Sequence, residues 1–140
     1  METVLHIANG HIFQEKTLVL KDVNFDLRQG QFVYLIGKTG TGKSSLLKTL
    51  YGELPLENGE GQIAGFDLTQ LKRKQIPLLR RKLGIVFQDF QLLTDRTVYK
   101  NLFFVMKSTG WKKKEEIKKR ADEVLKLVGL ENKGYKNDNC

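Results

Sequence analysis

The spacing of apolar residues near the N-terminus has the period of β-structure. Over residues 3–36, apolar and polar positions alternate from Val19 to Leu27, and a turn follows at Gln29-Gly30. This alternation predicts half-exposed antiparallel strands. Residues 32–36 (Phe-Val-Tyr-Leu-Ile) are instead continuously apolar, which predicts a strand buried on both faces, as in a parallel sheet covered by helices. The change of pattern therefore indicates entry into an α/β core.

A second continuous apolar run, residues 85–87 (Ile-Val-Phe), predicts a second buried strand. Such a strand delivers Gln88 and Asp89 at its carboxyl end, where ligand-facing residues belong in an open α/β sheet. A shorter strand is expected at residues 62–64.

Four segments have the spacing and end signals of helices. The first ends before Gly52, the second has Pro77 in its first turn and Gly84 at its end, and the fourth ends at Gly129. Thr97 is a candidate cap for the third. The predicted helices cover residues 43–51, 77–83, 97–107 and 113–128.

Residues 37–44 (Gly-Lys-Thr-Gly-Thr-Gly-Lys-Ser) fit G-x-x-x-x-G-K-[ST], the P-loop, between a predicted strand and a predicted helix. The glycines let the backbone curl so that successive N–H groups form an anion nest at a helix N-terminus. Lys43 would reach the β- and γ-phosphates, and the Ser44 hydroxyl would bind Mg²⁺. A simple glycine-rich turn is the alternative. The candidate nucleotide-binding residues are Gly37, Lys38, Thr39, Gly40, Thr41, Gly42, Lys43, Ser44 and Ser45.

Composition narrows the class of protein. The 140 residues are 40% hydrophobic, enough for one core, and the net charge of +8 favours an anionic partner without choosing among nucleotide, nucleic acid and membrane. Much of the basic excess lies in two clusters, residues 72–82 and 112–120, which solvated helix faces also explain.

The single cysteine, Cys140, excludes an intramolecular disulfide and fits a reducing compartment. No signal peptide or bilayer-length apolar run is present, so we expect a soluble, cytoplasmic protein.

Phe13, the P-loop and Gln88 follow one another in the order found in ATP-binding cassette (ABC) ATPases, and the chain resembles that family over nearly its whole length. Residues 76–101, and the run Asp-Arg-Thr-Val-Tyr at 95–99 above all, most resemble the bacterial cell-division ATPases of the FtsE type. The resemblance implies an α/β P-loop NTPase fold: the N-terminal portion of an ABC nucleotide-binding domain, with an antiparallel β subdomain and part of a RecA-like parallel sheet with helices.

The resemblance also implies an organisation along the chain. The antiparallel β part would span residues 1–30 and the P-loop core, to the glutamine loop, residues 31–94. The start of a helical subdomain would span residues 95–130, followed by a disordered tail at 131–140.

Two further site residues come from the resemblance. Phe13 corresponds to the aromatic residue that stacks on adenine, and ordinary packing is the alternative. Gln88 corresponds to the residue that contacts Mg²⁺ or the attacking water and senses the membrane partner, so it is the candidate catalytic and second metal-binding residue; a surface glutamine is the alternative. In the family, residues 90–93 would receive a short helix of the transmembrane subunit, with core packing as the alternative.

The printed residues contain no signature motif, no Walker B strand and no switch histidine, because His6 and His11 both precede the P-loop. The sequence looks cut off before these motifs. We therefore expect the chain to bind ATP with Mg²⁺ without hydrolysing it, and leave open whether it is an enzyme. A core strand without its neighbour also predicts aggregation or domain swapping.

The implied partners are a transmembrane subunit resembling the FtsX permease, which would hold the protein on the inner face of the cell membrane, and a second full-length copy that dimerises on ATP binding. Nucleic acid is not expected, since neither basic cluster is interleaved with aromatic residues. Two alternatives remain open: the ATPase of a lipoprotein or macrolide exporter, and a non-catalytic binding fragment.

Overall fold

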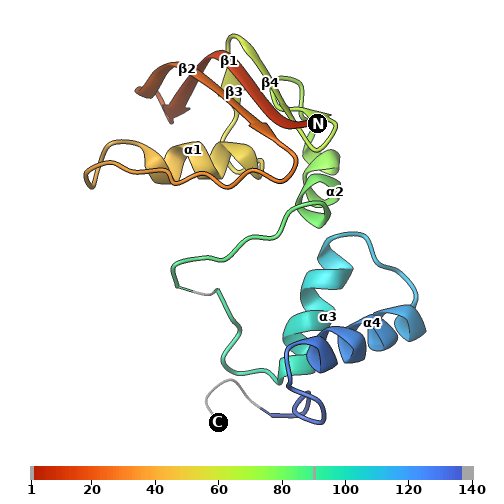
Figure 1. Ribbon diagram of the computed structural model, residues 1–140. Helices are drawn as coiled ribbons and strands as arrows, with labels where there is room; N and C mark the ends of the chain where they lie inside the picture. The colour runs from red at the N-terminus through yellow and green to blue at the C-terminus, as the bar shows by residue number, and fades with distance from the viewer. Residues whose placement is uncertain (1, 90, 137–140) are drawn as a thin grey trace. The chain divides into compact units, whose positions relative to one another are not determined.

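The structure, a computed structural model, describes residues 2–89 and 91–136 (Figure 1). The chain divides into two compact units, Met1–Leu83 and Gly84–Cys140, each with its own hydrophobic cluster. Each unit is described by itself.

An antiparallel sheet forms most of the first unit. Strands β1 (Thr3–Gln14) and β2 (Thr17–Arg28) make a long hairpin, and β4 (Glu60–Ile63) pairs with the other side of β1. The short strands β3 (Leu56–Glu57) and β5 (Phe66–Asp67) complete the order β2-β1-β4-β5, with β3 also paired to β1. The predicted N-terminal antiparallel structure is thereby confirmed, as is a strand close to residues 62–64.

The core of the first unit is built mainly on β1. Leu5, Ile7 and Ile12 of that strand are almost fully buried. Leu5 and Ile7 share a face by alternation, and irregularities in the β1–β2 register between Ile7 and Ile12 bring Ile12 into the same core. They pack with Leu56 and Ile63 from the neighbouring strands and with residues of the segments that cover the sheet. Burying one face of the hairpin in this way fixes its register, because a slip by one residue would turn these side chains toward water.

Two helices cover this unit. α1 (Lys43–Leu50) and α2 (Ile76–Arg81), which continues a 3₁₀ turn at Arg73–Gln75, lie close to the predicted ranges 43–51 and 77–83. Pro77 occupies the first turn of α2, where its missing N–H costs no helical hydrogen bond. Arg80 donates from Nε to the carbonyl oxygen of Tyr51 at 3.0 Å, which ties α2 to the end of α1.

The two buried parallel strands expected at residues 32–36 and 85–87 are not formed. Neither segment has regular secondary structure, and Phe32, Tyr34 and Ile36 are 81–86% exposed, while Val86 is 91% exposed. A strand buried on both faces needs hydrogen-bonding neighbours and a covering layer. Within residues 2–89 and 91–136 the only strand pairings are antiparallel ones among β1 to β5, so these segments have no such neighbour.

The second unit is a helical hairpin of α3 (Val98–Ser108) and α4 (Lys114–Leu127), each within one residue of the predicted bounds. Tyr99 of α3 packs on Ala121 and Leu125 of α4. The Thr97 hydroxyl accepts a hydrogen bond from Lys100 N, which confirms the expected cap. Gly129 ends α4 at a φ of 74°, the left-handed conformation that glycine adopts without strain.

Residues 134–136 pack against the start of α3. Gly134 and Lys136 accept backbone hydrogen bonds from Tyr99 and Val98, both at 2.8 Å, and the Tyr135 ring lies edge-on 5.0 Å from the Tyr99 ring. Cys140 and the rest of the predicted disordered tail from residue 137 lie outside the described residues.

In the part of the chain that the structure describes, no helix has both the length and the apolar character that crossing a bilayer requires.

Candidate functional site

The P-loop follows the sheet hairpin and leads directly into α1. Gly40 and Gly42 have φ values of 85° and 92°, which ordinary residues rarely adopt, so the glycines permit the turn. Thr41 donates from both its N–H and its hydroxyl to the carbonyl of Lys38, at 3.3 and 2.6 Å. These bonds close the loop from within, so its curved shape is set before any ligand binds.

The Lys43 side chain reaches back across this loop. Its ammonium group donates to the carbonyl oxygens of Gly37 and, at 3.2 Å, Lys38. The positive charge therefore lies over the curve of the loop. A nucleotide phosphate that enters the curve would meet this ammonium group and could replace the carbonyl oxygens as its acceptor.

The N-terminus of α1 adds backbone donors to the same place. Gly42 is the N-cap and offers no side-chain acceptor, and the first helical hydrogen bond runs from Leu46 N to Gly42 O at 2.9 Å. The N–H groups of the first turn, at residues 43–45, therefore have no partner inside the helix. Such unsatisfied donors together with the helix dipole form a site for anions.

The two serines of the motif lie in different surroundings. The Ser44 side chain is exposed and can reach a ligand, whereas Ser45 is buried at 7% exposure. The backbone carbonyl of Ser45 accepts a bond from the buried Thr49 hydroxyl at 2.8 Å. Ser44 can thus offer a hydroxyl to a metal ion, while Ser45 can contribute only its N–H to an anion without rearranging the helix.

The β1–β2 hairpin supports the loop at Gly42. A Cβ at this position would lie 2.9 Å from Leu20 Cγ and 3.0 Å from Val19 Cγ1 of β2. Phe13, half-buried, is in the same hairpin and pairs across it with Leu18. The structure therefore places Phe13 opposite Leu18, which directly precedes the Val19 and Leu20 side chains that lie against Gly42.

Gln88 belongs to the second unit, where it is exposed in a turn with Asp89. Phe90 lies outside the described residues.

Leu92 is exposed, and Leu93 is held by Asn101 of α3, whose side-chain amide accepts from Leu93 N at 2.8 Å and donates to Leu93 O at 3.0 Å. Asn101 is a structural residue of the glutamine-loop region that sequence reasoning missed, because the eight-residue spacing gives no local signal.

A charged cluster in the second unit was also missed. Tyr99 donates from its hydroxyl to Asp122, and Lys118 donates to Asp122 Oδ2 at 3.0 Å and to the Tyr99 hydroxyl at 3.2 Å. The hydrogen bond to Tyr99 and the bond to Lys118 lower the pKa of Asp122, and the hydrogen bond to Asp122 raises the pKa of Lys118. The spacing of Lys118 and Asp122, four residues apart on one helix, was the available signal.

The residues of the loop fit a nucleotide phosphate bound with Mg²⁺. The loop supplies a preformed curve, free N–H donors at the start of α1, one ammonium group and one exposed hydroxyl. Among the described residues, no cluster of three or more His, Cys, Asp or Glu could hold a metal ion by itself. A metal ion here would depend on the nucleotide for several of its ligands, as Mg²⁺ in phosphate-transfer sites commonly does.

Comparison with known proteins places the chain among nucleotide-binding subunits. The family model for the ABC transporter matches residues 20–139. The cell division ATP-binding protein FtsE of Streptococcus pneumoniae serotype 2 is 41% identical over 121 residues, which are 86% of this chain and 52% of the relative. The methionine import ATP-binding protein MetN 1 of Acinetobacter baylyi is 42% identical over 114 residues, 81% of this chain and 32% of the relative. The chain thus spans about half the length of this FtsE relative.

Solved structures of ABC proteins also match this chain. The ATP-binding cassette MJ0796 bound to ADP and Pi matches with a TM-score of 0.76 at 29% identity, covering 96% of this chain and 62% of that one. The cbiO1 protein of Clostridium perfringens, part of the ABC transporter complex cbiONQ, matches with a TM-score of 0.78 at 29% identity, covering 100% and 56%. These matches confirm the predicted fold class. The predicted resemblance to FtsE is confirmed by the sequence match to the FtsE relative.

Proposed function

Because this chain belongs to the ABC transporter family, we propose that it is the nucleotide-binding half of an FtsE-type ATPase that couples ATP binding and hydrolysis to a membrane partner in cell division. The observation that carries the nucleotide-binding part is the P-loop itself. Its shape is closed by Thr41 and Lys38, and the Lys43 ammonium group lies across it. The FtsE relatives support the cell-division part.

The proposed roles follow from the positions of the side chains. The N–H groups at residues 43–45 and the Lys43 ammonium group hold the phosphates, and the Ser44 hydroxyl holds Mg²⁺, which neutralises phosphate charge when bound. Phe13 offers its ring to the adenine base. Gln88 orients water at the γ-phosphate and responds to the membrane partner, as the family resemblance implies.

We further propose that these 140 residues bind ATP without turning it over. Phosphoryl transfer needs an oriented water molecule and charge stabilisation from several groups at once. The P-loop supplies part of that set, and the printed residues contain no Walker B aspartate, catalytic glutamate or signature motif to supply the rest. Two full-length copies, closed by ATP, would form the active dimer.

Nucleotide binding is tested by titrating the chain with a fluorescent ATP analogue in the presence of Mg²⁺. We expect saturable binding that Lys43→Ala weakens at least tenfold, since one charge-assisted bond to phosphate is worth about 1.5–3 kcal/mol. Lys48→Ala, on the same helix, is the matched control and should bind like the wild type. Equal losses in the two variants would show that the loop lysine has no special role.

The absence of turnover is tested by phosphate release at saturating ATP. We expect no release above a buffer control. Steady turnover that Lys43→Ala abolishes would overturn this part of the proposal, while leaving the binding part intact.

The competing function is the ATPase of a methionine importer, because MetN proteins match at 37–42% identity. Co-purification of the chain with an FtsX-type permease and, separately, with a methionine-import permease distinguishes the two. The proposal expects retention by the FtsX-type protein alone; retention by the methionine permease alone would replace cell division with import. Retention by neither would withdraw the membrane-partner assignment.

A further inference from the structure

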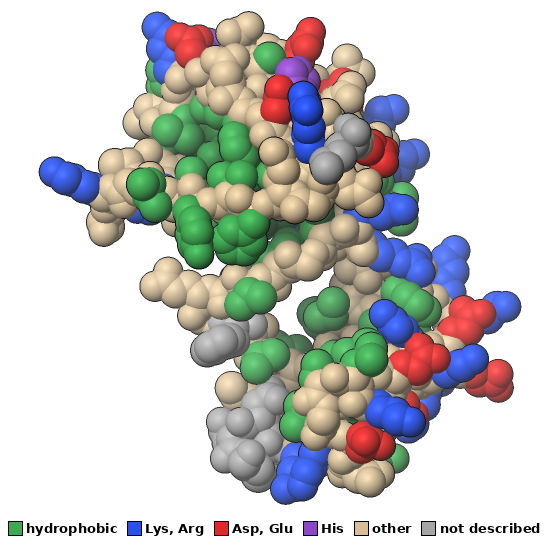
Figure 2. Space-filling view, in the orientation of Figure 1, with side chains coloured by type: hydrophobic (Ala, Val, Ile, Leu, Met, Phe, Trp, Pro, Cys, Tyr) green, Lys and Arg blue, Asp and Glu red, His purple; other side chains and the backbone are tan. Residues whose placement is uncertain are grey.

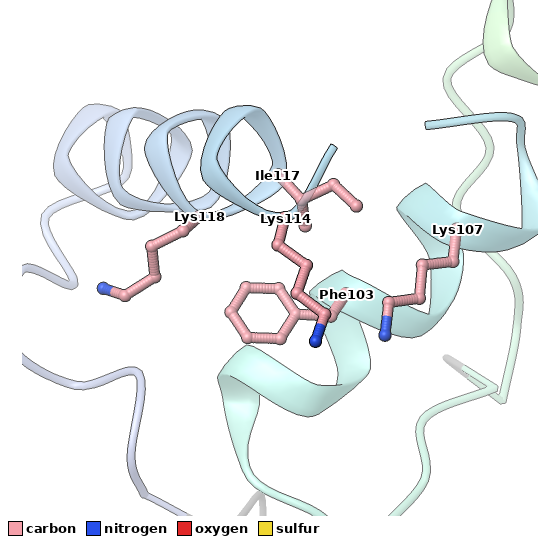
Figure 3. A pocket seen from close by; sticks show the side chains of 5 residues that line it. All are labelled: Phe103, Lys107, Lys114, Ile117 and Lys118. Carbon is pink, nitrogen blue, oxygen red and sulfur yellow. The ribbon is translucent and has the colours of Figure 1, made fainter. Parts of the chain in front are cut away.

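A groove runs between the two helices of the second unit. Phe103 and Lys107 of α3 and Lys114, Ile117 and Lys118 of α4 line a hollow of about 350 Å³, which we name the α3–α4 groove (Figure 3). Phe103 and Ile117 are its apolar side chains, and three lysines surround them. A hollow of this volume is large enough for a bulky side chain or a small molecule.

The floor of the groove is built into the core of the unit. Ile117 is 2% exposed, and the Phe103 ring stacks on Tyr99 with 5.4 Å between ring centroids. Lys118 is held in place by Asp122 and Tyr99, with its ammonium group 4.4 Å from the centre of the Tyr99 ring. The apolar surface therefore does not depend on a mobile side chain.

Two of the lysines, Lys107 and Lys114, have no carboxylate partner among the residues that the structure describes. In residues 2–89 and 91–136, the ion pairs of this unit join Lys113 to Glu116, Lys118 to Asp122 and Arg120 to Glu123, and none includes Lys107 or Lys114. Figure 3 shows Lys107 and Lys114, from opposite helices, extending toward the same end of the Phe103 ring. Lys114 is also the first residue of α4, where the helix dipole favours an anion.

The surrounding charge favours an acidic partner. Residues 98–127 contain nine Lys or Arg and four Asp or Glu. A net positive field of this kind attracts anions and raises their local concentration. An anion that carried only phosphate or carboxylate groups would leave the half-buried Phe103 ring in contact with water. A large apolar side chain between carboxylates would cover this ring and also pair with the lysines.

We propose that the α3–α4 groove binds an acidic segment of a partner protein. A large apolar side chain of that segment packs on the Phe103 ring, over the buried Ile117, and flanking carboxylates pair with Lys107 and Lys114. This interaction is independent of nucleotide binding at the P-loop.

The probe is an end-capped, fluorophore-labelled hexapeptide, Asp-Glu-Phe-Leu-Glu-Asp, titrated with the full 140-residue chain at 150 mM salt. Anisotropy gives the affinity. Fluorescence of Trp111, the single tryptophan of the chain, gives a second readout from an unlabelled copy of the same peptide, because this residue lies in the connection between α3 and α4. We expect saturable binding, and a change in Trp111 emission with the same midpoint.

Charge reversal tests the two lysines. The double variant Lys107→Glu/Lys114→Glu should weaken binding about tenfold, since two exposed ion pairs are replaced by repulsion. The control Lys112→Glu/Lys126→Glu makes the same change of net charge at exposed positions outside the groove, where salt screens the effect, and should weaken binding less than about twofold. Circular dichroism verifies that both variants keep their helices.

Peptide variants test the chemistry of the partner. Replacing the carboxylates by amides, or Phe-Leu by Ser-Ser, should each abolish measurable binding. The proposal is overturned if either peptide binds as well as the first, if both lysine pairs matter equally, or if no peptide binds saturably. Tighter binding of a 12-nucleotide RNA that depends on all four lysines would assign the surface to nucleic acid instead.

Discussion

At the scale of single residues, the P-loop shows how neighbours decide what a glycine does. Gly40 and Gly42 have the same left-handed backbone, yet a Cβ on Gly40 would meet nothing within 4 Å, whereas one on Gly42 would lie 2.9 Å from Leu20. Gly40 is therefore required for the turn alone. Gly42 is required for the turn and for the close approach of α1 to the hairpin.

Alanine substitutions separate these two requirements. Gly40→Ala should lower the free energy of unfolding by about 1–2 kcal/mol, the cost of a left-handed L-residue. Gly42→Ala should lower it further and also weaken nucleotide binding, because relieving the contact with Leu20 moves the start of α1. Urea unfolding and nucleotide titration measure the two effects. Equal stability losses in both variants would contradict the role given to the hairpin.

His6 links three strands and makes stability depend on pH. On β1 it is hydrogen-bonded to Asp26 of β2, and its Nε2 lies 3.5 Å from Glu60 of β4. The hydrogen bond to Asp26, with the charge of Glu60, raises the pKa of His6 above its usual 6.5. Since the folded state holds the proton more tightly, this contribution to stability is full below pH 6.5 and is lost as the pH rises through the folded-state pKa.

We therefore expect the wild-type free energy of unfolding to decrease more between about pH 5.5 and 8.5 than that of His6→Gln, measured by urea unfolding. Asp26→Asn should reduce the dependence in the same way. Glu15→Gln, which changes an exposed carboxylate in the hairpin turn, is the control. If the free energy of unfolding of His6→Gln falls as much over this pH range as that of the wild type, His6 is not the source of the pH dependence.

At the scale of elements, helices formed where local signals predicted them. α3 begins after the Thr97 cap, α4 ends at Leu127 shortly before the left-handed Gly129, and α2 has Pro77 in its first turn. Each signal acts through hydrogen bonds or dihedral angles within a few residues, so it works without knowledge of the rest of the fold. The strands predicted at residues 32–36 and 85–87 have no comparable local hydrogen bond. The backbone N–H and C=O groups of a strand pair only with those of a neighbouring strand.

The cap of α3 can be tested directly. Thr97→Ala removes the acceptor of Lys100 N and should lower the free energy of unfolding of the second unit by about 1 kcal/mol. Thr94→Ala, at an exposed turn position nearby, should have little effect. Unfolding followed by Trp111 fluorescence reports on this unit. Similar losses in both variants would show that the hydroxyl of Thr97 does not stabilise the helix.

At the scale of the whole molecule, each unit has its own core and also exposes apolar side chains, and in the first unit several of these are consecutive, at residues 32–36. Figure 2 shows apolar side chains gathered along the lower edge of the first unit, where Figure 1 places the segment that follows β2. Phe32 and Tyr34 belong to this segment and contact each other, with ring centroids 5.0 Å apart. Apolar side chains in a segment without strand partners favour association between molecules.

Self-association is the expected consequence. Sedimentation velocity at micromolar concentration should show species larger than the monomer, and the triple variant Phe32→Ser/Tyr34→Ser/Ile36→Ser should reduce them. Leu127→Ser removes one exposed apolar side chain from α4 and should leave the distribution unchanged. If the wild-type chain sediments as a single monomer, the self-association predicted from the sequence is wrong.

By itself, the sequence determined the features that depend on neighbouring residues. These are the P-loop, the four helices with the Thr97 cap of α3, the antiparallel hairpin and the family to which they belong. Tertiary structure alone decided which apolar segments become buried, since residues 32–36 have the composition of a core strand and lie exposed. It also decided that Ser45 is enclosed while Ser44 is open, and that Lys107 and Lys114 line one groove from two helices. The physical reason is that burial and the pairing of distant groups depend on what the rest of the chain brings alongside, and no local pattern contains that information.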